Sequence, residues 1–100
     1  MVYETIGASE VDWAGKTYSE IQSIGEQDGS VAVIPVGSIE QHGHHLAVAV
    51  DTLLVDAVSH LGAERAIDDD VPVVVTPPIW SGFSPHHMAF GGTLTLGLDT

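Results

Sequence analysis

The chain has 100 residues, 44% of them hydrophobic, and carries 14 acidic against 2 basic side chains, for a formal net charge of −12. This length suits one small domain with a modest core, and no apolar run of about 18 residues is present to span a membrane. A negative field of this strength repels phosphate backbones, so we expect no nucleic-acid partner. The absence of cysteine excludes disulfides, thiolate metal sites and thiol nucleophiles.

The composition also bears on where the protein works. The N-terminus lacks the basic flank and apolar run of a secretory signal, and we expect a cytoplasmic protein. The apolar content argues against disorder, so the acidic residues are expected on the surface of a folded domain. Such a surface destabilises the fold by self-repulsion unless salt screens it, which favours a halophilic source.

The first predicted element is a short helix. Trp13, Tyr18, Ile21 and Ile24 recur at intervals that place them on one helix face, and Gly25 and Gly29 are expected to lie past the end of this helix.

Two apolar runs, residues 31–36 and 71–76, predict buried strands, because they are rich in β-branched residues without polar alternation. Between them, Asp51 opens a helical pattern. The order strand, helix, strand predicts an α/β fold built on a βαβ unit with a parallel sheet. One face of the predicted helix carries Leu53, Leu54, Ala57, Val58 and Leu61.

An irregular polar stretch follows each predicted strand, at residues 37–50 and 79–92. Both stretches lie after the carboxyl ends of their strands, where open α/β sheets place ligand sites. A two-strand sheet needs helices on both faces and further strands beside it, so we expect the chain to be a truncated part of a larger sheet.

The first polar stretch combines carboxylate and imidazole side chains. In extended backbone Glu40 and His42 point to the same side, and Asp51 can reach the same region if the loop folds back. Where thiolates are absent, these residue types are the preferred ligands of zinc and manganese, and a carboxylate can bridge two metals. We predict a divalent metal site, with a solvated surface cluster as the alternative.

The second polar stretch carries aromatic residues and two adjacent histidines. Trp80 and Phe83 suit either a substrate lid or a core anchor. His86 and His87 cannot point the same way in extended backbone, so only His87 is predicted to face a site. His60, on the predicted helix, is expected to be a surface or packing residue.

The residues of both stretches resemble one known family. Residues 34–46 read Ile-Pro-Val-Gly-Ser-Ile-Glu-Gln-His-Gly-His-His-Leu and precede Asp51 at a helix start. This pattern is similar to the signature of the creatininase (creatinine amidohydrolase) family. Residues 78–95 resemble the family's later block of Gly, Ser, His and Phe before Gly-Thr, so the resemblance extends over nearly the whole chain from residue 12.

The resemblance implies a three-layer α/β/α fold, with residues 1–100 as the N-terminal part of one domain. It implies a metal-dependent hydrolase, in which water activated by two divalent ions, zinc or manganese, attacks an amide carbon and a non-peptide C–N bond is cleaved. The substrate would be a small-molecule amide, cyclic amide or formamide, and family members assemble into homo-oligomers.

The resemblance also assigns residues to roles. Glu40 would bind one metal ion, His42 the other, and Asp51 would bridge them. The remaining residues would line the pocket, with His45 and His87 as catalytic side chains and His44, Ser84, Trp80 and Phe90 as substrate contacts.

The chain departs from the family pattern at two points. Gly91 stands where the family has a proline before Gly-Thr, and the later Asn-Gly-His motif that completes the metal sites does not occur. Two alternatives therefore stay open: a non-catalytic metal-binding or assembly fragment, and a binding module that keeps the pocket without hydrolysis.

Overall fold

The computed structural model describes residues 9–99. Within them the chain forms two compact units, one from residues 9–34 and 58–77 and the other from residues 35–57 and 78–99. Helix α2 (Val50–Asp68) contributes its first turns to the second unit and its later turns to the first. Each unit is described by itself.

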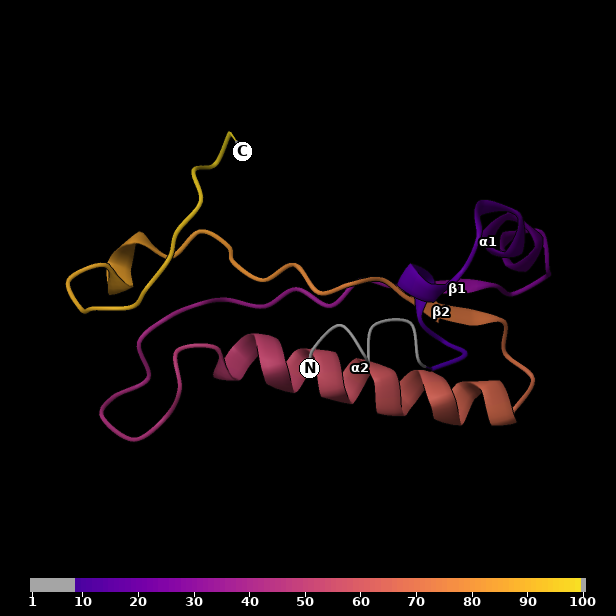
Figure 1. Cartoon of the computed structure of the whole chain (residues 1–100), viewed down its shortest axis with the longest axis horizontal. Coiled ribbons are helices and arrows are strands. Elements are labelled where there is room, and N and C mark those ends of the chain that lie inside the picture. Colours follow the sequence, from indigo (N-terminus) through magenta and orange to yellow (C-terminus); the bar gives the residue numbers. More distant parts are fainter. Residues whose placement is uncertain (1–8, 100) are drawn as a thin grey trace. The chain divides into compact units, whose positions relative to one another are not determined.

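The first unit begins with two short helical elements (Figure 1). Trp13 lies in a separate 3-10 turn, η2 (Trp13–Gly15), and helix α1 follows at Tyr18–Gly25. The single helix predicted from the apolar spacing is therefore wrong in extent. Thr17 explains the break, since its side chain accepts a hydrogen bond from the N–H of Glu20 and caps a new helix.

The predicted parallel sheet is confirmed, with strands shorter than expected. Strands β1 (Val31–Val33) and β2 (Val73–Val75) pair in parallel, with Val31 opposite Val73. All of β2 is buried, as predicted, because the segment at Asp12 bridges to Val75 on its other side. β1 was also predicted to be buried, but Val31 is 46% exposed. The reason is that no described strand pairs with the outer edge of β1.

The core of the first unit is small and packs through short side chains of α2. Ala63 is buried beside Val11 and the valines of β2, and Ala66 and Ile67 pack against this cluster. Small residues let the helix approach the sheet closely. The leucine-rich face that the sequence predicts on α2 is instead solvent-exposed in the described residues, with exposed fractions of 54% for Leu53, 59% for Leu54, 65% for Val58 and 67% for Leu61.

The second unit is built from the two polar stretches and the start of α2. The stretches pair through backbone hydrogen bonds, in which Gly37 N–H donates to the carbonyl of Ile79 and Ile79 N–H donates to the carbonyl of Pro35. Farther along, an antiparallel bridge joins Ile39 to Leu94. These contacts hold the loop after β1 beside the loop after β2.

In residues 9–99, no helix combines the length and apolar character that crossing a bilayer requires.

Candidate metal centre

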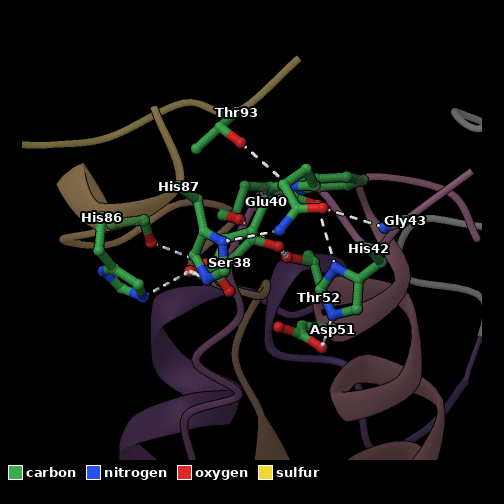
Figure 2. A network of polar contacts seen from close by, with 12 residues as sticks. Ser38, Glu40, His42, Gly43, Asp51, Thr52, His86, His87 and Thr93 are labelled. Atoms are coloured by element: carbon green, nitrogen blue, oxygen red, sulfur yellow. Dashed lines mark hydrogen bonds and ion pairs between the residues drawn. The ribbon is translucent and has the colours of Figure 1, made fainter. Parts of the chain in front are cut away.

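A close backbone approach positions the first loop on the start of α2. A Cβ added at Gly37 would lie 2.2 Å from Oγ1 and 2.6 Å from Cα of Thr52, so only glycine fits there. Thr52 is 1% exposed, and its hydroxyl lies 2.8 Å from the carbonyl of Trp80 and 3.2 Å from that of Ser38. Thr52 therefore ties both loops to the first turn of α2, where Asp51 also lies (Figure 2).

Glu40 lies at the centre of the polar network in Figure 2. Its side chain is only 13% exposed. The hydroxyls of Ser84 and Ser38, with Ser84 the stronger influence, stabilise the charged carboxylate and lower the pKa of Glu40 below its ordinary value. The two hydroxyl oxygens lie 3.1 Å from each other. Glu40 is thus an ionised acceptor at neutral pH.

On one side of Glu40, His42 and Asp51 form a pair. The distance from His42 Nε2 to Asp51 Oδ1 is 3.2 Å. The other ring nitrogen, Nδ1, lies 3.0 Å from the carbonyl oxygen of Glu40. That carbonyl, followed by the charge of Asp51, raises the pKa of His42 above its ordinary value. The backbone therefore fixes the ring, and Nε2 is directed at the Asp51 carboxylate.

On the other side of Glu40, two adjacent histidines approach its carboxylate. Nε2 of His87 lies 3.4 Å and Nε2 of His86 lies 3.9 Å from Oε2 of Glu40. The expectation that only His87 could face this region is wrong, because the backbone here is not extended. Pro85 begins the 3-10 turn η3 (Pro85–His87), in which successive side chains diverge by about 120° instead of the 180° of a strand.

The sequence contained a signal for this turn. Proline is favoured at the first position of a helical turn, and Pro85 directly precedes the two histidines.

Gln41 is a site residue that the sequence interpretation missed. Its side-chain Oε1 accepts from the N–H of Gly43 at 3.0 Å, and its Nε2 lies 3.0 Å from Nδ1 of His87. Its own backbone N–H donates to Oγ1 of Thr93, also at 3.0 Å. Alternation along the chain indicated only that Gln41 points away from Glu40 and His42. The partner of the Gln41 side chain, His87, lies on the other loop, and the spacing of residues near Gln41 could not predict this contact.

The residues predicted to line the pocket lie in different environments. Ser84 is 2% exposed and contacts Glu40. His44 and His45 are exposed at the tip of the turn between His42 and Leu46, and neither ring makes a hydrogen bond or ion pair with another described residue. Their predicted roles stay predictions.

The two predicted aromatic contacts are also solvent-exposed. Trp80 is 53% and Phe90 is 58% exposed. Trp80 meets the site through its backbone, since its carbonyl accepts from Thr52.

The chemistry of these side chains suits a divalent cation. Among the described residues, Glu40, His86 and His87 form the one group of three whose donor atoms all lie within 4.8 Å of one another. Asp51, which pairs with His42, is a second carboxylate of the same network (Figure 2). Carboxylate and imidazole without thiolate is a donor set that zinc and manganese accept.

Comparison with known proteins places this arrangement in a family. The family described as creatininase, creatinine amidohydrolase, matches residues 14–100. The "Mycofactocin precursor peptide peptidase" of Mycobacterium tuberculosis (strain CDC 1551 / Oshkosh) is 38% identical over 72 residues, covering 67% of this chain and 29% of the relative. The "Creatinine amidohydrolase" of Pseudomonas putida is 34% identical over 76 residues, covering 76% of this chain and 27% of that enzyme.

Solved structures agree with the sequence relatives. A structure described as "Creatininase Mn" superimposes with a TM-score of 0.75 at 32% identity, covering 89% of this chain and 35% of that one. The chain therefore spans about a third of the length of the proteins it matches. The parallel sheet with its helices fits the α/β fold of these structures. From the motif, the fold and the comparisons together, the chain belongs to the creatinine amidohydrolase (creatininase) family.

Proposed function

We propose that this chain supplies part of a metal-dependent hydrolase site that cleaves an amide C–N bond in a small molecule, such as a cyclic amide or a formamide. The observation that carries the proposal is the pair of His42 and Asp51 beside the carboxylate of Glu40, whose side chain is 13% exposed (Figure 2). The relatives are hydrolases by name, which supports the reaction class.

The hydrogen bonds of His42 fit the role of a metal ligand. A carbonyl oxygen can only accept, so Nδ1 of His42 donates its proton to the carbonyl of Glu40. In the neutral ring, Nε2 then carries the free lone pair, and it faces Asp51. Metal-binding histidines are commonly held in this way, with the distal N–H on a backbone carbonyl.

Glu40 and Asp51 would supply the negative charge of the site. The hydroxyls of Ser84 and Ser38 orient the Glu40 carboxylate and keep it ionised. When divalent cations are bound by Glu40, His42 and Asp51, they supply Lewis acidity toward an amide carbonyl and lower the pKa of water. The "Creatininase Mn" structure and a creatininase variant of "Zn-Zn type" support manganese or zinc as the ion.

The remaining predicted residues would act on the substrate. We assign proton exchange to His87 and His45, and contact with the bound amide to His44, Ser84, Trp80 and Phe90. The burial of Ser84 at 2% exposed and its contact with Glu40 support its place beside the reacting group.

Metal content by elemental mass spectrometry, after purification without chelators, tests the ligand assignment. We expect one or two zinc or manganese ions per chain, and Asp51→Asn should lower this occupancy. Asp69→Asn is the matched control, because it makes the same change at an exposed turn residue after α2. Equal occupancy in the two variants would refute a ligand role for Asp51.

The reaction class is tested with the metal-loaded chain and three substrates: creatinine, an N-formyl amine and a short peptide. Hydrolysis of either small amide supports the proposal. Hydrolysis of the peptide alone would refute the non-peptide assignment and favour an activity like that named for the mycobacterial relative. Tight metal binding without turnover would favour the binding module instead.

A further inference from the structure

The side-chain amide of Gln41 is held in a single orientation. The N–H of Gly43 can only donate, so the atom 3.0 Å from it must be the carbonyl oxygen Oε1 of Gln41. Gly43 has φ +74°, a conformation that glycine adopts without strain. The Gln41 backbone is fixed as well, by its hydrogen bond to the hydroxyl of the buried Thr93. The amide nitrogen therefore faces away from the turn.

This orientation decides which nitrogen of His87 carries the proton. The Gln41 amide nitrogen is a donor only, and it lies 3.0 Å from Nδ1 of His87. Nδ1 must therefore accept, so in the neutral ring the proton is on Nε2. Nε2 lies 3.4 Å from Oε2 of Glu40, within ion-pair distance of that carboxylate.

We propose that Gln41 is a positioning residue that holds His87 as its Nε2–H tautomer, so that the nitrogen near Glu40 carries a proton and His87 is not a metal ligand. Distance alone would count His87 as a ligand, since it belongs to the three-donor group with Glu40 and His86. A metal ion needs a bare nitrogen, and the Nε2–H tautomer offers none on the side that faces Glu40.

The tautomer is measured directly in the metal-free chain. Long-range ¹H–¹⁵N correlation spectra of the histidine rings distinguish Nε2–H from Nδ1–H, and we would record them at about pH 9, where an ordinary histidine is neutral. The resonances of His87 are assigned from their loss in His87→Asn. We expect Nε2–H as the major form in the unmodified chain, and Nδ1–H as the major form would overturn the proposal. This measurement requires neither metal nor substrate.

Gln41→Glu tests whether Gln41 is the cause. A glutamate offers two acceptor oxygens, one for Gly43 N–H and one for a proton on Nδ1 of His87, so the major tautomer should switch to Nδ1–H. Gln27→Glu makes the same charge change at an exposed residue of the first unit and should leave the ring of His87 unchanged. An Nε2–H form that persists in folded Gln41→Glu would refute the role of Gln41. If that variant does not fold, Gln41→Leu, which lacks the donor, should shift the ring toward a mixture of both forms.

The consequence for metal binding rests on the proposed function and has its own measurement. With Nε2 bare in Gln41→Glu, titration with Zn²⁺ should show binding about 10-fold tighter than in Gln27→Glu, a size typical of outer-shell changes. A switched tautomer with equal affinity would overturn the claim that Gln41 keeps His87 off the metal. If the unmodified chain binds no Zn²⁺, the proposed function fails, while the tautomer measured in the metal-free chain still decides the role of Gln41.

Discussion

The two sides of Glu40 present the same residue type at nearly the same distance from a carboxylate. His42 places Nε2 3.2 Å from Asp51, and His87 places Nε2 3.4 Å from Glu40. They differ in what holds the other nitrogen, which is a backbone carbonyl for His42 and a side-chain amide for His87. The distance of Nε2 from a carboxylate therefore does not tell which ring nitrogen carries the proton, whereas the partner of Nδ1 does.

The His42 side and the His87 side of Glu40 both depend on the close contact between Gly37 and Thr52. Disrupting this contact should lower the free energy of unfolding more than any other change considered below. Gly37→Ala would force a Cβ to within 2.6 Å of Cα of Thr52, which flexible side-chain movement cannot relieve. We expect a loss of about 3 kcal/mol of unfolding free energy or more, as in severe overpacking, measured by urea denaturation. Both the His42 and the His87 contacts should be lost together.

Gly62→Ala is the matched control for this prediction. Gly62 lies inside α2 with nothing within 4 Å of an added Cβ. Alanine there should raise stability by about 0.5–1 kcal/mol, because glycine loses more backbone entropy in a helix. Equal destabilisation by the two substitutions would show that the contact with Thr52 is unimportant.

Removal of each imidazole in turn should affect Zn²⁺ binding unequally. His42→Ala should weaken Zn²⁺ binding by at least the roughly 10–100-fold that loss of an outer-shell partner costs, because it deletes a ligand. His87→Ala should change the affinity by less than about 3-fold, since its nitrogen facing Glu40 carries a proton. Calorimetric titration measures both, and a larger loss for His87→Ala would reverse the assignment of the two sides.

The smallest expected effect is the pH dependence of stability in the metal-free chain. The lowered pKa of Glu40 contributes stability that is present above the ordinary value of 4.5 and is lost as pH falls through the lowered value. The raised pKa of His42 contributes stability that is present below 6.5 and is lost as pH rises through the raised value. The two contributions coexist between these ordinary values.

Thermal unfolding of the chain, followed by circular dichroism with a chelator present, should therefore show stability falling at both ends of the pH range, in an acid limb and an alkaline limb. Glu40→Gln should flatten the acid limb and, because the charge of Glu40 also raises the pKa of His42, slightly reduce the alkaline limb. His42→Asn should flatten the alkaline limb alone. An acid limb that is unchanged in Glu40→Gln would mean that the hydroxyls of Ser84 and Ser38 do not stabilise the ionised carboxylate.

Much of the fold could be predicted from local pattern. The β-branched runs located both strands, and the helix predicted to open at Asp51 begins one residue earlier, at Val50. Burial was harder to predict. Val31 belongs to an apolar run with the composition of a central strand, and yet it lies on an edge that pairs with no other strand in the described residues. The residue types in a segment indicate whether it can form a strand. Whether that strand is buried depends on which other segments pack beside it.

For the site, the available chemistry could be predicted from the residues alone: carboxylate and imidazole donors without thiolate, in a motif that identifies the family. The spacing of Glu40 and His42 along one strand-like segment is a local property, so it could be read directly. The partner of His87, in contrast, depends on the tertiary structure. Gln41 and His87 are 46 residues apart, and the orientation of their hydrogen bond depends on the packing of two loops. Local spacing carries no information about such a contact, because the proton's position is set by the partner that folding brings to Nδ1.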